Sequence, residues 1–161
     1  MLMNKKSQIG TVDLFVAVSI ASLLLIIILS TYYYYNDVLE EKVLYNDMQM
    51  TAFAAVDYLV KSPGQPVDWE LNPSNATRIG LASRPLVLSQ NKTITFTKTN
   101  NQTIKEALNI VGYDFYFSLK SQDGTTIASG KPPSAKSYVV NAQRIVTYRN
   151  YSAKVDFKVW K

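Results

Sequence analysis

Residues 8–30 read QIGTVDLFVAVSIASLLLIIILS, and this stretch decides how the rest of the chain can fold. After Asp13 the next charged residue is Asp37, and only serines interrupt the apolar side chains from Leu14 to Ser30. A helix of this composition is apolar on every face, which a soluble domain of this size does not need. It is also long enough to cross a bilayer. The stretch therefore predicts a membrane-resident segment rather than a buried core helix.

The residues on either side of this stretch predict its orientation. Lys5 and Lys6 precede it, and positive charge holds that end in the cytoplasm, so the remainder should lie outside the cell. Tyr32–Tyr35 follow it, either at the outer membrane interface or as a packing surface against neighbouring chains. The end of the apolar run lacks an A-x-A pattern, so cleavage at that point by a secretory signal peptidase is not expected.

The helix is expected to continue beyond the tyrosines, because no proline or glycine occurs from Thr11 to Ser62. Apolar residues then recur at three- and four-residue steps, which is typical of an amphipathic helix facing its own domain core. The helix should end at Ser62-Pro63-Gly64. A helix over 8–61 would be about 80 Å long. Its predicted apolar stripe comprises Val38, Leu39, Val43, Leu44, Met48, Ala52, Phe53, Val56, Leu59 and Val60.

Residues 62–161 read as a small β-rich domain. A proline-bearing loop comes first, and its Trp69 and Leu71 are expected to anchor it on the long helix. Gly112 is expected to end a short amphipathic helix over 102–110, and Asp123-Gly124 and Arg149-Asn150 are expected to form tight turns. The fold class is α+β: one long helix, apolar in front and amphipathic behind, packed on a mostly antiparallel sheet. The strands predicted from alternation are 86–89, 92–98, 113–120, 125–128, 138–148 and 152–160.

Composition excludes several kinds of site. The 161 residues contain no cysteine and no histidine, which rules out disulfides, Cys or His metal sites and Cys or His catalysis. The net charge of +5 is spread thinly, so a nucleic-acid partner has little support. Asp68 and Glu70 could pair on a cation, although a solvated loop explains them better. No phosphate-binding loop or catalytic motif occurs, so we expect neither an enzyme nor a bound metal or cofactor.

The N-terminal residues resemble those of archaeal type IV pilins. Lys5-Lys6-Ser7-Gln8, followed by Ile9-Gly10-Thr11-Val12-Asp13 and an apolar run, is most similar to the subclass whose leader is cut before a glutamine. The resemblance implies that a prepilin peptidase removes residues 1–7 and leaves Gln8 as the mature N-terminus. Many members have glycine where Ser7 stands, and their acid lies one position earlier than Asp13. A cut after Gly10 is the alternative and would put Asp13 third.

The same resemblance implies a filament. Residues 8–35 would first lie in the membrane and later form the filament core, assembled by a membrane platform and a motor ATPase. Asp13 would then pair with the α-amino group of Gln8 in a neighbouring chain, since a lone buried carboxylate is costly. Its alternative role is a favourable position near the helix N-terminus, in the headgroup region. The expected contacts between subunits are Gln8, Asp13, Leu14, Phe15, Val18, Leu25 and the tyrosines Tyr32, Tyr33, Tyr34 and Tyr35.

Four N-x-Ser/Thr sequons lie in the part predicted to be outside the cell, at Asn75, Asn91, Asn101 and Asn150. They are candidate glycosylation sites, with ordinary polar loop chemistry as the alternative. The sequence thus predicts a membrane precursor that becomes a structural subunit of an extracellular pilus-like filament used for adhesion or surface attachment. The competing hypothesis is a single-helix membrane-anchored adhesin or accessory protein that does not polymerise.

Overall fold

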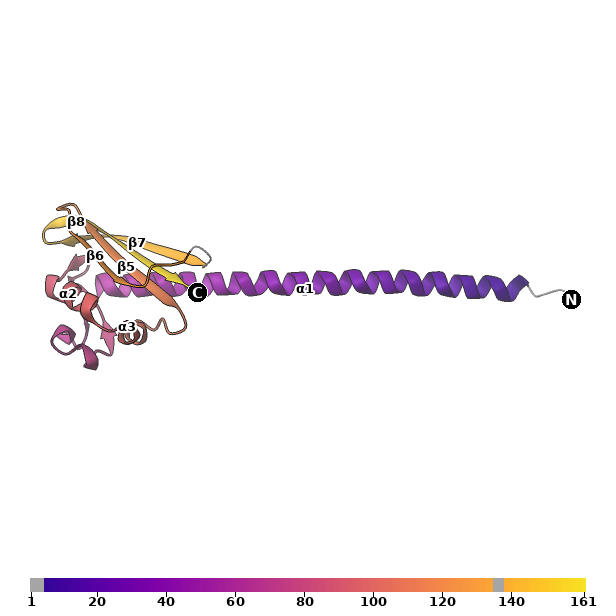
Figure 1. Ribbon diagram of the computed structural model, residues 1–161, viewed down its shortest axis with the longest axis horizontal. Helices are drawn as coiled ribbons and strands as arrows, with labels where there is room; N and C mark the ends of the chain where they lie inside the picture. The colour runs from indigo at the N-terminus through magenta and orange to yellow at the C-terminus, as the bar shows by residue number, and fades with distance from the viewer. Residues whose placement is uncertain (1–4, 135–137) are drawn as a thin grey trace. The chain divides into compact units, whose positions relative to one another are not determined.

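The computed structural model describes residues 5–134 and 138–161, with side chains from Val12 onward apart from that gap. A long helix, α1 (Lys5–Lys61), is followed by a segment of short elements and then by long strands (Figure 1). The chain divides into two compact units, residues 1–43 and 44–161. The short elements are β1 (Gly64–Gln65), η1 (Trp69–Leu71), η2 (Pro73–Asn75), β2 (Arg78–Ile79), β3 (Ala82–Arg84), β4 (Val87–Leu88), α2 (Gln90–Lys98) and α3 (Asn101–Ala107).

The second unit contains a six-stranded sheet in the order β3-β4-β7-β8-β5-β6. Its longer strands are β5 (Asp114–Ser121), β6 (Thr126–Gly130), β7 (Val139–Tyr148) and β8 (Tyr151–Trp160). All neighbouring strands are antiparallel except β4 and β7, which run parallel. The β7–β8 turn places Arg149 and Asn150 at φ 52° and 68°, as a tight two-residue hairpin requires. The predicted mostly antiparallel α+β fold is therefore confirmed.

One face of this sheet packs on residues 44–61 of α1, along which the long strands lie in Figure 1. The alternation of apolar and polar residues explains which face of the sheet packs on the helix, because every second residue of a strand points to the same side. On β8 these residues are Ala153, Val155, Phe157 and Val159, and all of them are buried. The helix contributes Met48, Ala52, Ala55, Val56, Leu59 and Val60. The predicted apolar stripe is therefore buried in its later part apart from Phe53, which is exposed, as are Leu39 and Val43.

The predicted strand over 92–98 is wrong, because Gln90–Lys98 form the helix α2. The alternation of threonines with Ile94 and Phe96 suggested a strand, but tertiary packing overrides such a preference. Phe96 is buried against Phe117 of β5, with ring centroids 5.2 Å apart. The helix also accommodates its threonines, since Thr93 donates a hydrogen bond to the Ser89 carbonyl at 2.7 Å.

Two smaller predictions also require correction. Leu71 does not anchor its loop, since 81% of its surface is exposed, whereas Trp69 is fully buried as expected. Gly112 does not end the short helix α3, which stops at Ala107. Asn109 is left-handed at φ 55°. Its N–H bonds to the Glu106 carbonyl, and the next N–H, from Ile110, reaches back to the Lys105 carbonyl. Asparagine therefore takes the position usually occupied by glycine after a helix.

A polar cluster joins the rear of α1 to strand β7. The Arg144 Nε donates to Asp57 Oδ1 at 2.6 Å, and the Lys61 Nζ donates to Asp57 Oδ2 at 2.9 Å. The guanidinium of Arg144 also lies over the ring of Phe53, 5.2 Å from its centroid. The hydrogen bond from Arg144 is the main cause that lowers the pKa of Asp57 below its ordinary value. The cluster therefore links the helix to the sheet through the ionised form of Asp57.

Arg144→Met should lower the free energy of unfolding of the second unit by about 1 kcal/mol at neutral pH, since both groups of the ion pair are partly exposed. The folded-state pKa of Asp57 lies below its unfolded value, so this stabilisation is present above about pH 4 and is lost as the pH falls through the folded pKa. The variant should therefore lose less stability on acidification than the parent. Denaturant unfolding at pH 7 and pH 3 measures the loss of stability in the parent and the variant, with Arg84→Met, at an exposed position, as control. Equal losses in the parent and in Arg144→Met would contradict the prediction.

Candidate functional site

The candidate functional surface is the apolar part of α1 in the first unit. Every large apolar side chain from Val12 to Leu29 is about half exposed or more, and Phe15 is 75% exposed. The helix is long and apolar enough, by length and composition, to cross a membrane, and no part of its most apolar window is buried. Leaving so much apolar surface in water is unfavourable at about 25 cal/mol per Å². This surface therefore requires lipid or protein around it.

Three hydroxyls on or next to this segment are hydrogen-bonded within the helix. Ser19 donates to the Phe15 carbonyl at 2.7 Å, and Ser22 donates to the Val18 carbonyl at 2.8 Å. Thr31 donates in the same way to the Ile27 carbonyl, also at 2.8 Å. A buried hydroxyl without a hydrogen bond costs free energy, and these bonds remove that cost inside the helix. The segment thus suits surroundings without water on all its faces.

Asp13 is exposed at the start of the apolar segment. The helix begins at Lys5 and has no acidic residue in its first turn, so Asp13 lies in its third turn. The favourable effect of a helix N-terminus on a carboxylate falls off within the first turn. The dipole alternative for Asp13 is therefore weak in the full chain, and the pairing of Asp13 with a cationic partner stays a prediction.

The four tyrosines Tyr32–Tyr35 encircle the helix. Successive residues are about 100° apart around a helix axis, so four in a row face nearly every direction. All four are exposed, and Tyr32 and Tyr33 pack edge to face with ring centroids 6.1 Å apart. Asp13 and Tyr32 are separated by about 28 Å along the helix, close to the roughly 30 Å of a bilayer hydrocarbon core. The polar ends of the segment are spaced as a membrane span requires.

The structure describes the side chains of some of the other predicted contact and processing residues, but not of all. Leu14, Phe15, Val18 and Leu25 are all exposed on α1, and their contacts with other copies stay a prediction. Residues 5–8 belong to the helix, but the side chains of Lys5, Lys6, Ser7 and Gln8 lie outside the described part. Cleavage of the leader before Gln8 therefore stays a prediction.

The sequon asparagines are all exposed. Asn75 lies in η2, Asn91 in α2 and Asn101 at the start of α3, whereas Asn150 lies in the β7–β8 turn. The Thr93 of the second sequon is buried and its hydroxyl is bonded to the Ser89 carbonyl. The four asparagine side chains are thus accessible, and their glycosylation stays a prediction.

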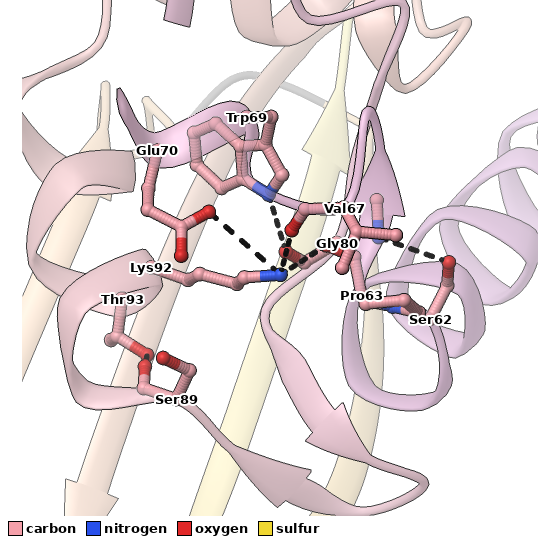
Figure 2. A network of polar contacts seen from close by, with 10 residues as sticks. Ser62, Pro63, Val67, Trp69, Glu70, Gly80, Ser89, Lys92 and Thr93 are labelled. Carbon is pink, nitrogen blue, oxygen red and sulfur yellow. Dashed lines mark hydrogen bonds and ion pairs between the residues drawn. The ribbon is translucent and has the colours of Figure 1, made fainter. Parts of the chain in front are cut away.

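A buried lysine that the sequence did not reveal fixes the loop after α1 (Figure 2). The Lys92 Nζ donates to the Pro63 carbonyl at 2.7 Å and to the Val67 carbonyl at 2.5 Å. It also lies 3.8 Å from the Glu70 carboxylate, which is largely buried, so the solvated loop favoured from the sequence is wrong for Glu70 and holds only for the exposed Asp68. Buried ammonium groups need such acceptors. The spacing of Lys92, Thr93 and Phe96 places them on one face of a helix and could have indicated that Lys92 is buried. The predicted strand over 92–98 did not allow for this.

A shallow groove of about 210 Å³ opens between the rear of α1, β2 and α3. Its surface includes Ala54, Ala55, Ala107 and Leu108, with Tyr58 and Arg78 among the other lining residues. The guanidinium of Arg78 lies over the Tyr58 ring, 5.5 Å from its centroid. This groove could not be predicted from the sequence, because it combines small residues from separate elements.

Across the part of the chain that the structure describes, no group of three or more His, Cys, Asp or Glu residues is placed to hold a metal ion. Comparison of the chain with models of protein families, with curated proteins and with solved structures found no match. What the chain does is therefore inferred from its own residues.

Proposed function

We propose that this protein is a structural subunit of an extracellular filament of the type IV pilus kind, built through the apolar part of α1. The observation that carries the proposal is the apolar surface from Val12 to Leu29, exposed on all faces and headed by one carboxylate. The resemblance of its N-terminal residues to archaeal type IV pilins supports the same proposal. The second unit, with a core of its own, would form the filament surface.

Assembly replaces lipid by sister helices over the same area. The apolar surface is stable in a bilayer, and it leaves the bilayer only if identical helices from other copies cover it. Hydroxyls that are already bonded within the helix make this exchange possible without unsatisfied polar groups. A helix of this kind is therefore suited to both surroundings in turn.

Asp13 supplies specificity in this proposal. Removal of residues 1–7 would create an α-amino group at Gln8, a cation that a neighbouring copy's Asp13 can pair with. On the helix surface Ala17 and Ala21 follow Asp13 at four-residue steps, so small side chains adjoin the carboxylate on one face. A second helix can approach closely there, and the ion pair would set the axial register between copies.

A second candidate function is a binding module held in the membrane by one helix. The spacing of Asp13 and the tyrosines favours it, because a bilayer alone would satisfy that arrangement. A simple anchor gives this carboxylate no specific partner, however. The filament explains that residue and is the function we prefer.

The test combines the mass of the mature chain with electron microscopy of material sheared from the cell surface. We expect a chain that begins at Gln8 and filaments that contain it. An intact chain found only in membranes would support the anchored module. A stable, detergent-free monomer with the apolar segment folded against its own second unit would contradict both.

A further inference from the structure

The loop from Pro66 to Leu71 displays apolar side chains from a rigid backbone. Val67 and Leu71 are largely exposed, and Leu71 at 81% is more exposed than Phe15 in the apolar part of α1. Between them Trp69 is fully buried, and its indole Nε1 donates to the Gly80 carbonyl at 2.8 Å. The exposed residues are therefore not the consequence of a loosely packed loop.

Lys92 makes three further contacts in and beside this loop, as Figure 2 shows. The Lys92 Nζ bonds to the carbonyls of Pro63 and Val67 and lies beside the Glu70 carboxylate. Gly64 lets the ring of Trp69 approach, since a Cβ at that position would lie 2.5 Å from the indole. A loop fixed before binding loses little conformational entropy on binding, which favours contact through its exposed side chains.

The groove lined by Ala54, Ala55, Ala107 and Leu108 complements these side chains. An apolar cavity of about 150 Å³ accepts a benzene-sized group, so a groove of about 210 Å³ can accept an aliphatic side chain. Charge also matches. The exposed Asp68 lies between Val67 and Leu71 on the loop, and Arg78 lines the groove.

We propose that the Val67–Leu71 loop of one copy docks in the Ala54/Leu108 groove of a second copy, with Asp68 facing Arg78. The inference rests on the proposed function and adds to it a contact between second units, apart from the apolar part of α1. The loop and the groove are different surfaces, so the contact is heterologous. Repeated heterologous contacts that do not close form helical filaments, whereas an isologous contact would stop at a dimer.

The natural absence of cysteine allows a direct test. Leu71→Cys and Ala54→Cys are made as separate full-length variants, mixed, assembled and oxidised mildly. We expect disulfide-linked dimers in the mixture and none from either variant alone, because each variant carries a cysteine on only one side of the contact. Ile145→Cys, at an exposed position on the outer face of β7, replaces Ala54→Cys in the control mixture and should give no dimers.

The outcomes separate this inference from the proposed function. Filaments from the mixture without a disulfide between positions 71 and 54 would overturn the loop contact and leave the filament proposal standing. If no filaments form, the same oxidation is carried out on the concentrated mixture in detergent, where dimers would support the contact alone and their absence would overturn it. Dimers of Leu71→Cys alone would also overturn it, since they would show loop against loop.

A charge reversal adds a second readout. Asp68→Arg and Arg78→Asp should each reduce the yield of disulfide-linked dimers at least severalfold when introduced into both cysteine variants. The two reversals together should restore most of the yield, because the opposite charges then face each other again. No recovery in the double variant would contradict the pairing of Asp68 with Arg78.

Discussion

Asp13→Ala should leave the chain inserted in the membrane and reduce filament assembly about a hundredfold or more. In the proposed filament, the variant would leave the α-amino group of Gln8 in a neighbouring chain without its partner among apolar helices. Removing one partner of a buried ion pair costs about 3–5 kcal/mol, and each 1.4 kcal/mol is a factor of ten in affinity. Membrane insertion depends on the residues from Leu14 onward, which the variant retains.

The measurements are the amount of sheared filament and the amount of subunit in the membrane fraction. Asp13→Asn keeps the shape of the side chain without its charge and should assemble as poorly as Asp13→Ala. Asp37→Ala removes an exposed acid beyond the tyrosines and should assemble normally. Normal filaments from Asp13→Ala would exclude Asp13 from the assembly mechanism.

Lys92→Met should lower the free energy of unfolding of the second unit by about 3 kcal/mol. The methionine fills the space of the lysine stem but leaves the Pro63 and Val67 carbonyls and the Glu70 carboxylate without their cation. A buried charge or polar group that has lost its partner is strongly destabilising. In a domain of this size the loss corresponds to a fall in Tm of roughly 10–15 °C.

Tryptophan fluorescence during thermal or denaturant unfolding measures this, because Trp69 and Trp160 are both buried in the second unit. Lys98→Met is the matched control, since Lys98 lies in the same helix and is exposed. Glu70→Gln added to Lys92→Met should recover part of the loss, because it removes the uncompensated charge. Equal stability of the Lys92→Met and Lys98→Met variants would show that the network contributes little.

Some of the fold could be predicted from single stretches of sequence. The apolar run from Leu14 to Ser30 needed no tertiary information, because no partner within the chain could cover a helix that is apolar on every face. The β7–β8 hairpin was also predictable, since alternation on both strands brackets Arg149-Asn150. In these stretches local pattern and final structure agree.

Other residues could not be placed without the tertiary structure. Lys92–Lys98 has the alternation of a strand, yet it is helical because Phe96 packs against Phe117. Leu71 is a large apolar residue of the kind that usually fixes a loop by being buried. It is nevertheless exposed, because Trp69 and Lys92 already fix the loop. The groove between the rear of α1 and α3 has no counterpart in the linear sequence.

The sequence by itself determined that this chain carries a long helix needing lipid or other copies around it, followed by a small α+β unit. Only the tertiary structure decided which side of each short element is buried, and hence which loop and groove remain available to a second copy. The physical reason is the difference in scale. Twenty-three successive residues without a charge set their own surroundings, whereas a short mixed segment takes its conformation from whatever packs against it.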